Sequence, residues 1–491
     1  MNQSMKANTK TFLKPNKKII LSWMIVLFIF ILSNQISYAA IPYYNYSYDF
    51  TGNPVPGPAG YIPERVVKGQ DMGCGALKNP MDLFVAHDGR IFIADTGNNR
   101  IIILNKYFKF IREISVFSNN GKEDSLKSPQ GVYCTESGDV YVADTDNARV
   151  VVFDEYYNFK RIIGKPEAEV IPKNIVYRPQ KIAVDRMGKI YVVAENMLEG
   201  IVEFSAGGEF NRFFGATPAT NNPIERFWRM FYTREQKKKA VLFLPTEYTN
   251  LTIDEYGFVY ATIKNKRFDQ IKRLNSAGKN IIRHDGFFAD AFGERVSNRV
   301  SPQFVDISVS SNGNYYILDN FSGRIYEYNA SGDMLFIFGG IGDQVGLFIN
   351  PIAVEQWEDK IFVLDESRGE ITIFSTTDFG KYVAKANNLY MDGKYIDALE
   401  PWQKVLRMNA NYRLAYIGIG NAYYKLENYK EAMKYFELSG YRRGYSKAFK
   451  EYRTEVLRDN FSWFVSAIIL LIIGFKLLFK AFKKFAVSLN N

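Results

Sequence analysis

The sequence predicts a mainly β protein built from six repeated four-stranded units, followed by a small C-terminal α-helical module and one transmembrane helix. Three observations predict this fold class. A tight turn between two apolar strands recurs six times, the apolar spacing becomes helical after Phe374, and an apolar segment runs from Phe461 to Phe479. At 491 residues the chain is also too long for one ordinary core, which makes a repeat the first explanation to test.

The chain begins with several lysines and an apolar run from Ile19 to Leu32. Ser37 and Ala39 then supply small residues at the −3 and −1 positions of a cleavage site before Ala40. Residues 1–39 are therefore expected to be a secretory signal peptide or, because the apolar run is long for one, an uncleaved N-terminal anchor. Both alternatives place the following residues outside the cytoplasm.

Residues 40–377 contain an N-terminal extension and then six copies of one strand pattern. In each copy two apolar strands around a tight turn form a hairpin, and further strands follow. The opening prolines are Pro80, Pro129, Pro179, Pro245, Pro302 and Pro351, and the turn residues are Gly89, Gly138, Gly188, Gly257, Gly313 and Asp359. Consecutive four-stranded antiparallel units of this spacing predict a six-bladed β-propeller.

The stretches IADTGNNRIIIL and VADTDNARVVVF join the second and third strands of the first two copies. They resemble the repeat of NHL propellers, and the resemblance covers about residues 60 to 377. An Asp that ends a strand can accept hydrogen bonds from the following backbone N–H groups, and an Arg can pair with it. Copies three and four lack both residues, so a structural role is expected for the motif residues Asp95, Arg100, Asp144, Arg149, Asp319, Arg324 and Asp365.

The first strand of each propeller blade lies nearest the axis, so residues that follow the opening prolines are expected at one mouth of the channel. Carboxylate and amide side chains recur there at Asp82, Gln130, Gln180, Glu247 and Gln303. Such a group can bind a polyol, a peptide or a cation through its oxygens, or it can form hydrogen bonds from blade to blade.

Six-bladed propellers that resemble this pattern include two kinds of metalloenzyme. Sugar lactonases use an oxygen-ligated divalent metal, and the peptide-amidating lyase relies on histidines. The chain has two histidines, His87 and His284, which excludes a three-histidine zinc site. A lactonase-like hydrolase with Ca²⁺ at the channel mouth stays open as the alternative function. Apart from that Ca²⁺, no metal or cofactor is predicted, and no catalytic residue is assigned.

An insertion between the third and fourth copies starts at Asn221. Its aromatic residues Phe227, Trp228 and Phe231 precede a run of lysines, which is the pattern of a short helix with an aromatic and a basic end. We expect the insertion either to pack over a blade edge or to present a docking surface to a partner or to lipid headgroups.

Residues 378–460 have helical spacing. Ala398, a small residue that lets helices approach closely, is followed 34 positions later by Ala432. A 34-residue period of paired helices resembles tetratricopeptide repeats, which implies a concave surface for peptides or other proteins. We expect this module either to bind a partner, with Trp402 and Tyr429 on the partner surface, or to act as a spacer above the bilayer.

Residues 461–480 are predicted to span the membrane, because Lys476 is the only charge between Phe461 and Phe479 and lies close enough to one end to reach the interface. Further lysines follow in the tail, residues 481–491, so the positive-inside bias places the C-terminus in the cytoplasm. The net charge of +10 is thus concentrated beside the two apolar segments. This distribution indicates membrane topology and argues against a nucleic-acid partner.

The whole arrangement resembles membrane-anchored NHL and tetratricopeptide proteins of Gram-positive bacteria. This resemblance implies a single-pass cell-membrane protein that acts as an extracytoplasmic binding or scaffold protein, with a protein partner in a membrane transport assembly. A sensor with its own cytoplasmic output domain is disfavoured, because only about a dozen residues follow Phe479. Cys74 and Cys134 can form one disulfide or remain buried thiols, and neither is assigned any chemistry.

Overall fold

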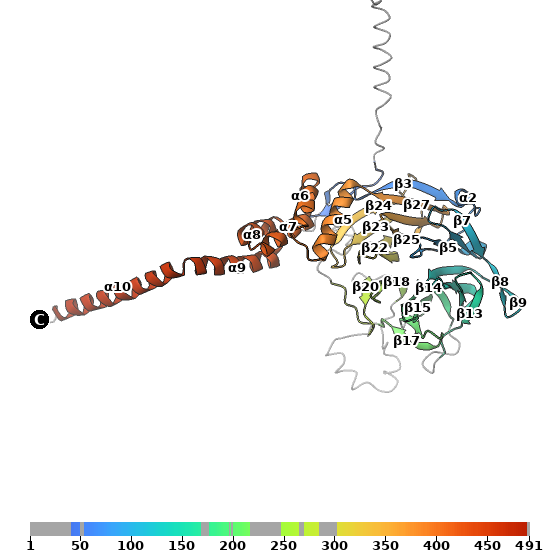
Figure 1. The fold of residues 1–491 in the computed structure, drawn as a ribbon, viewed down its shortest axis with the longest axis horizontal. Coiled ribbons are helices and arrows are strands. Elements are labelled where there is room, and N and C mark those ends of the chain that lie inside the picture. The colour runs from blue at the N-terminus through green and yellow to red at the C-terminus, as the bar shows by residue number, and fades with distance from the viewer. Residues whose placement is uncertain are drawn as a thin grey trace, which may run out of the picture. The chain divides into compact units, whose positions relative to one another are not determined.

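The computed structural model describes residues 41–49, 54–167, 176–195, 197, 200–216, 247–264, 270–283 and 302–488. Six antiparallel sheets follow one another along the chain, and their first strands contact one another in a closed cycle (Figure 1). Helices follow the last sheet, and the final one is long and apolar. These features confirm the predicted mainly β fold with six propeller blades, C-terminal helices and one apolar helix. The predicted signal segment, residues 1–39, lies outside the described residues.

Each of the first three blades pairs its four strands in chain order. A short hairpin follows blade 1, and single 3₁₀ turns connect the second and third strands of blades 1 and 2. The bounds are β4 (Asp82–Val85), β5 (Ile91–Asp95), η1 (Thr96–Asn98), β6 (Arg100–Leu104), β7 (Phe110–Ile114), β8 (Val116–Asn119), β9 (Lys122–Ser125), β10 (Pro129–Cys134), β11 (Val140–Asp144), η2 (Thr145–Asn147), β12 (Arg149–Phe153), β13 (Phe159–Ile163), β14 (Arg178–Val184), β15 (Ile190–Glu195), β16 (Ile201–Phe204) and β17 (Phe210–Phe214).

Three strands of blade 4 are described, and blades 5 and 6 have four each. Their bounds are β18 (Tyr248–Ile253), β19 (Val259–Ile263), β20 (Ile271–Leu274), β21 (Phe304–Val309), β22 (Tyr315–Asp319), β23 (Arg324–Tyr328), β24 (Met334–Gly339), β25 (Pro351–Trp357), β26 (Lys360–Asp365) and β27 (Glu370–Thr376).

The fourth strand of blade 6 comes from the N-terminal side of the chain. Strand β3 (Tyr61–Lys68) pairs antiparallel with β27, as Figure 1 shows. The register of this pairing brings Tyr61 opposite Thr376. The pairing closes the ring, and it also satisfies backbone groups that would otherwise form an open sheet edge. The strand pattern of the sequence did not predict this closure, because it depends on a pairing between residues more than 300 positions apart.

Neighbouring blades share the hydrophobic core. In β5, Ile91 and Ile93 pack with Phe362 and other residues of blade 6, whereas Phe92 and Ala94 pack with residues of blade 2. Successive side chains of a strand point to opposite faces of its sheet, so both faces of each blade are buried. This explains why the strands are almost continuously apolar.

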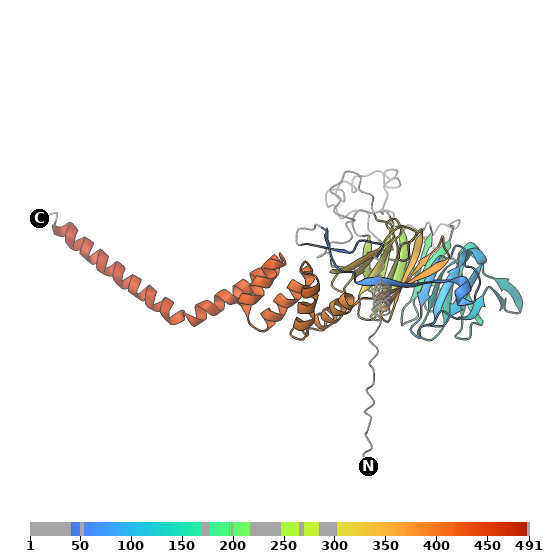
Figure 2. The ribbon, with the colours of Figure 1, turned by 90° about the horizontal axis from the view of Figure 1, so that it is seen from above.

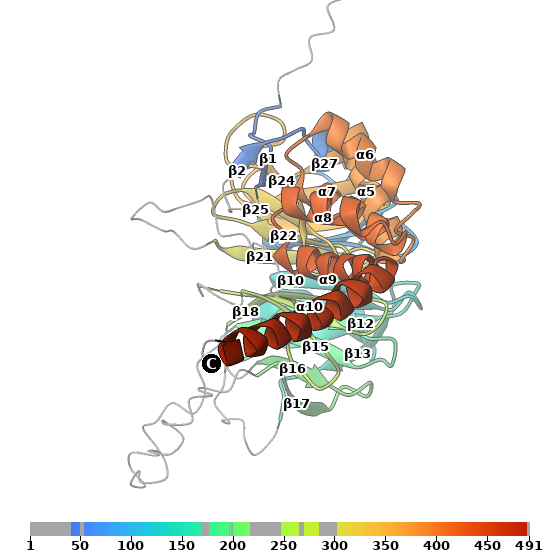
Figure 3. The same cartoon turned by 90° about the vertical axis from the view of Figure 1, so that its left-hand side faces the viewer.

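The C-terminal helices pack in sequence, each against the next as far as α9, and Figures 2 and 3 show them from two directions. Gly418 permits one close approach, because a Cβ at that position would lie 2.2 Å from the Trp402 Nε1 atom. The bounds are α5 (Asp378–Met391), α6 (Leu399–Met408), α7 (Arg413–Lys425), α8 (Tyr429–Leu438), α9 (Arg442–Asp459) and α10 (Phe461–Ser488); the N-terminal side adds β1 (Tyr46–Tyr48), β2 (Pro54–Pro56) and α2 (Gly69–Met72).

Helices α5 to α9 form the helical module, and side chains bond it to blade 5. Asn329 donates to the Asn387 amide oxygen of α5 at 3.0 Å, and the Tyr412 hydroxyl donates to the Leu335 carbonyl at 3.1 Å. The Phe336 ring of β24 lies 5.9 Å from Phe379 of α5, edge to face. The module is therefore packed against the propeller and not only connected to it by the chain.

Candidate functional site

Six residues occupy the same register position on the first strands of the six blades. Their cross-strand partners are Ala94, Ala143, Val193, Thr262, Leu318 and Leu364. The six positions hold Asp82, Gly131, Lys181, Asn250, Asp306 and Ala353. The four polar members are all buried. Two more residues lie two positions further along these strands: Ser308 follows Asp306, and Glu355 follows Ala353. The channel cluster is the name used here for these six residues: Asp82, Lys181, Asn250, Asp306, Ser308 and Glu355.

One half of the channel cluster is an ion pair across blade 2. The Lys181 ammonium of blade 3 donates to Asp82 Oδ1 of blade 1 and to the Met81 carbonyl at 2.9 Å. Gly131 holds the same register position on blade 2, and a Cβ there would lie 2.2 Å from the Gln180 carbonyl oxygen of blade 3. The other Asp82 oxygen accepts the Val132 N–H of blade 2 at 2.8 Å. A single carboxylate thus joins three consecutive blades.

The other half of the channel cluster joins blades 4, 5 and 6 in a similar way. Asn250 donates to Asp306 Oδ1, and the Val354 N–H donates to Asp306 Oδ2 at 2.5 Å. The Ser308 hydroxyl donates to Glu355 Oε2 at 2.9 Å. In both halves a carboxylate of one blade accepts the N–H of the next blade at the same register. This arrangement provides the blade-to-blade hydrogen bonds that the sequence left open as an alternative to ligand binding.

The channel cluster has three carboxyl groups, those of Asp82, Asp306 and Glu355, and one ammonium group, that of Lys181. The pKa values of all three acids are raised. Burial raises the pKa of Asp306 to about 7, with Lys181 lowering it and Asp82 raising it. Burial, and then the charge of Asp306, hold the pKa of Glu355 well above its ordinary value. Burial also raises the pKa of Asp82, against the effect of the Lys181 charge. The raised pKa values favour the protonated forms of these acids, and protonation reduces the negative charge that the protein buries here.

Of the predicted mouth residues, only Asp82 belongs to the channel cluster. Within the described part of the chain, no hydrogen bond or ion pair joins Gln130, Gln180, Glu247 or Gln303 to it. Gln303 is exposed, and Glu247 forms a surface ion pair with Lys264 at 3.3 Å.

The opening proline is not a constant marker of the channel position. In blades 4 and 5 the channel position lies further from the proline than in the other blades, so Asn250 and Asp306 were missed. The turn glycine is the better origin. Counting back seven positions from it gives the channel residue in each of the first five blades.

The Asp residues of the repeat motif form short hydrogen-bond networks. Asp95 accepts the Lys78 N–H at 2.7 Å and pairs with Arg100 Nε at 2.8 Å, and Asp144 makes the equivalent contacts in blade 2. Asp319 and Asp365 also accept backbone N–H groups, while Arg324 lies over the Tyr46 ring at 5.7 Å. Thr96 then donates to the Pro129 carbonyl of blade 2 at 2.6 Å. The motif thus ends one strand, starts the next and bonds neighbouring blades.

A second buried carboxylate lies where the ring closes. Glu327 of β23 accepts hydrogen bonds from the Tyr61 hydroxyl at 2.9 Å, Tyr316 at 3.1 Å and Asn314 at 3.0 Å. Burial raises the pKa of Glu327 to about 7, although all three hydrogen bonds lower it. Because Tyr61 begins the closing strand β3, this carboxylate links ring closure to blade 5.

Of the two residues of the helical module that were predicted on the partner surface, Trp402 is buried and Tyr429 is half-buried. Trp402 is 2% exposed and stacks on Tyr412 with ring centroids 6.4 Å apart, so it is a core residue of the helical module. The period of 34 residues identifies such positions without distinguishing inside from outside. Tyr429 is half-buried against Tyr424. Phe227, Trp228 and Phe231 lie outside the described residues.

The possible metal ligands and the cysteines of the described residues are further candidates for chemistry of their own. It contains no group of three or more His, Cys, Asp or Glu side chains that could hold a metal ion. Cys74 and Cys134 are free and buried, and burial raises the pKa of the Cys134 thiol to about 11. His87 is exposed at the turn of blade 1.

The profile of the NHL repeat matches residues 126–153, which contain the second copy of the motif. No match is found among curated proteins. Among solved structures, virginiamycin B lyase from Staphylococcus aureus is 13% identical over 68% of this chain and 94% of that protein, with a TM-score of 0.37. PQQ-bound aldose sugar dehydrogenase from Streptomyces coelicolor is 14% identical over 66% and 99%, with a TM-score of 0.38. Likeness at this level transfers no activity to the chain.

Residues Phe461–Lys483 of α10 contain an 18-residue stretch that has a mean hydropathy of 2.3 and is not buried against other parts of the protein. They are long and apolar enough to cross a membrane. The fold and the repeat match therefore define a β-propeller protein that contains an NHL repeat and has, among its described residues, one possible membrane-spanning helix.

Proposed function

We propose that this chain is a membrane-anchored extracytoplasmic scaffold protein that presents its propeller and helical module to a protein partner. We further propose that the helical module is of the tetratricopeptide type and that the partner belongs to a membrane transport assembly. Only Asn460 separates α9 from the apolar helix α10, so spanning by α10 would hold the helical module at the bilayer surface. The lysines near the end of α10 favour a cytoplasmic C-terminus.

The observation that carries the proposal is a set of half-buried tyrosines across the helical module. Tyr423 stacks on Tyr435 with ring centroids 5.5 Å apart, and Tyr424 meets Tyr429 edge to face at 5.5 Å. The neighbouring Leu438 at the end of α8 is 55% exposed. Tyrosines are enriched in protein interfaces, because a rigid ring offers apolar area and a polar hydroxyl.

Site-specific photocrosslinking in intact membranes tests the proposal. A photoreactive phenylalanine at Leu438 is expected to crosslink an integral membrane protein, while the same group at Tyr256, a 75% exposed turn residue of blade 4, serves as the control. A product at Leu438 that is absent at Tyr256 supports the scaffold. Equal background at both positions would count against it.

The hydrolase alternative rests on the carboxyl groups of the channel cluster. Acids with raised pKa values occur often at catalytic sites, and a bound Ca²⁺ would add a Lewis acid. The full chain would then hydrolyse members of a lactone panel, lose this activity in chelator, and lose it on Asp82→Asn. A scaffold shows no turnover under any of these conditions.

A further inference from the structure

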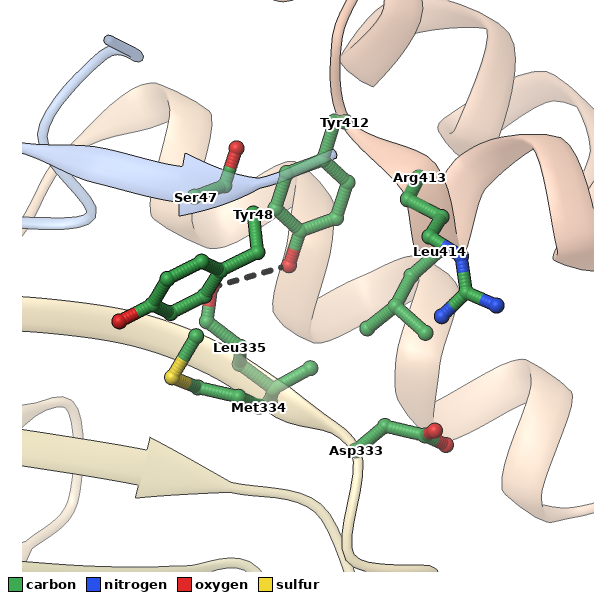
Figure 4. A pocket seen from close by; sticks show the side chains of 8 residues that line it. All are labelled: Ser47, Tyr48, Asp333, Met334, Leu335, Tyr412, Arg413 and Leu414. Atoms are coloured by element: carbon green, nitrogen blue, oxygen red, sulfur yellow. Dashed lines mark hydrogen bonds between the residues drawn. The ribbon is translucent and has the colours of Figure 1, made fainter. Parts of the chain in front are cut away.

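A small pocket lies where the N-terminal hairpin, blade 5 and the helical module meet. Figure 4 shows its lining: Tyr48 of β1 and Met334 of β24 on one side, Leu414 and Arg413 of α7 on the other, and Asp333 near the Arg413 end. Three elements that are distant in the sequence thus build one opening. It is separate from the channel cluster, and the sequence analysis did not identify it.

The apolar part of the pocket's lining consists of Tyr48, Met334, Leu335, Tyr412 and Leu414. The Tyr412 hydroxyl is already bonded to the Leu335 carbonyl, so the Tyr412 ring is fixed and presents carbon atoms to the opening (Figure 4). Tyr412 also stacks on the buried Trp402. Together with the Met334 and Leu414 side chains, these groups form a preorganised place for one apolar side chain.

Arg413 supplies donors that the described residues leave unused. Its Nε donates to the Ser439 carbonyl at 2.9 Å, but neither Nη group forms a hydrogen bond within the described part of the chain. The side chain is half-buried, and burial lowers the pKa of its guanidinium. The Ser47 hydroxyl beside the pocket is buried and also forms no hydrogen bond there. A ligand that offers an acceptor oxygen would complete the bonding of Arg413.

The charge of Asp333 indicates which acceptor fits. Asp333 and Tyr441 raise the pKa of Arg413 and so partly offset the effect of burial. A negative charge close to the guanidinium favours a neutral carbonyl over a second anion, because an added carboxylate would meet Asp333 as a like charge. A neutral carbonyl beside an apolar side chain is the repeating unit of a peptide.

We infer that this pocket binds an extended peptide segment of the partner, seating one apolar side chain between Tyr48, Met334 and Leu414 while Arg413 donates to an adjacent peptide carbonyl. The inference rests on the proposed scaffold function and deepens it by naming the chemistry of the partner. Recognition of this kind uses one side-chain pocket and one main-chain contact.

The test uses the full chain in lipid nanodiscs and N-acetyl-leucine N-methylamide, the smallest peptide unit with an apolar side chain. Saturation-transfer NMR is expected to show binding in the millimolar range, as suits a ligand of this size. Arg413→Gln should weaken binding about tenfold, since one charge-assisted hydrogen bond is lost. Leu414→Phe should block binding by filling the pocket. Arg443→Gln, an exposed arginine of α9, is the matched control and should change nothing.

Several results would overturn the inference. They are tighter binding of anionic N-acetyl-leucine, equal binding of the glycine analogue, no binding of any probe, or an unchanged affinity in both pocket variants. The two proposals fail separately. A crosslink from Leu438 without probe binding refutes the pocket alone, whereas probe binding without a crosslink refutes the scaffold alone.

Discussion

Replacing Glu327 by Gln should remove one component of the pH dependence of stability. The pKa of Glu327 is about 7 in the folded protein, against an ordinary value of 4.5. A carboxyl group whose pKa is higher in the folded state favours folding most below about pH 4.5, and that contribution is lost as the pH rises through 7. The difference corresponds to about 3 kcal/mol at alkaline pH, because one pKa unit is about 1.4 kcal/mol.

Gln fits the same hydrogen bonds. Its Oε1 can accept from Asn314 and Tyr316, and its Nε2 can donate to the Tyr61 hydroxyl, which turns to accept. We therefore expect Glu327→Gln to match the wild type near pH 4.5 and to exceed its free energy of unfolding by up to about 3 kcal/mol at pH 8.

Urea unfolding of the full chain in detergent, followed by tryptophan fluorescence at several pH values, measures this difference. Other buried acids titrate equally in both proteins, so the comparison isolates Glu327. Glu358→Gln, at an exposed turn of blade 6, is the control and should follow the wild-type profile. Parallel profiles for wild type and Glu327→Gln would refute the reasoning.

Three other substitutions probe the packing of the blades and the helices. Gly131→Ala should lower the free energy of unfolding by about 2 kcal/mol, because its Cβ would lie 2.2 Å from a carbonyl oxygen of blade 3. Thermal unfolding measures this change, and an unchanged stability would contradict the close approach. Lys181→Met should lower the free energy of unfolding by about 3 kcal/mol, because it leaves Asp82 buried without its cation. The added substitution Asp82→Asn should recover most of that loss. If the stability losses of the two single variants simply add in the double variant, the pairing is refuted. Trp402→Ala should lower the free energy of unfolding by at least about 3 kcal/mol, and the helical module should unfold first. Circular dichroism would show this as an early loss of the helical signal. A spectrum and an unfolding midpoint equal to those of the wild type would contradict the core position of Trp402.

Local patterns in the sequence predicted the blades, because strand, turn and strand lie within a few residues of one another. The same locality explains why the pairing of the motif residues Asp95 and Asp144 with an arginine five positions later could be predicted. The backbone N–H groups that they accept, from Lys78 and Lys127, lie 17 positions earlier in the chain and not in the following turn. The alternation of apolar residues does not reveal which distant strand completes a sheet, so the role of β3 was found only in the structure.

The candidate sites were harder to predict because they combine side chains from separate elements. Lys181 and Asp82 come from blades 3 and 1, 99 positions apart, and no spacing in the sequence encodes their contact. Trp402 illustrates a different limit, since periodicity marks packing positions without giving their exposure. The pocket at Arg413 needs three elements at once and has no sequence pattern of its own.

The central claim is that the helical module holds a membrane partner, and the mass of the complex extracted in mild detergent tests it most directly. The wild-type chain, 56.5 kDa, should elute in a complex larger than its own mass, and Leu438→Asp should elute alone, because a charge placed at this 55% exposed residue would be buried in the interface. Elution of both proteins alone, or of both in the same complex, would contradict the claim.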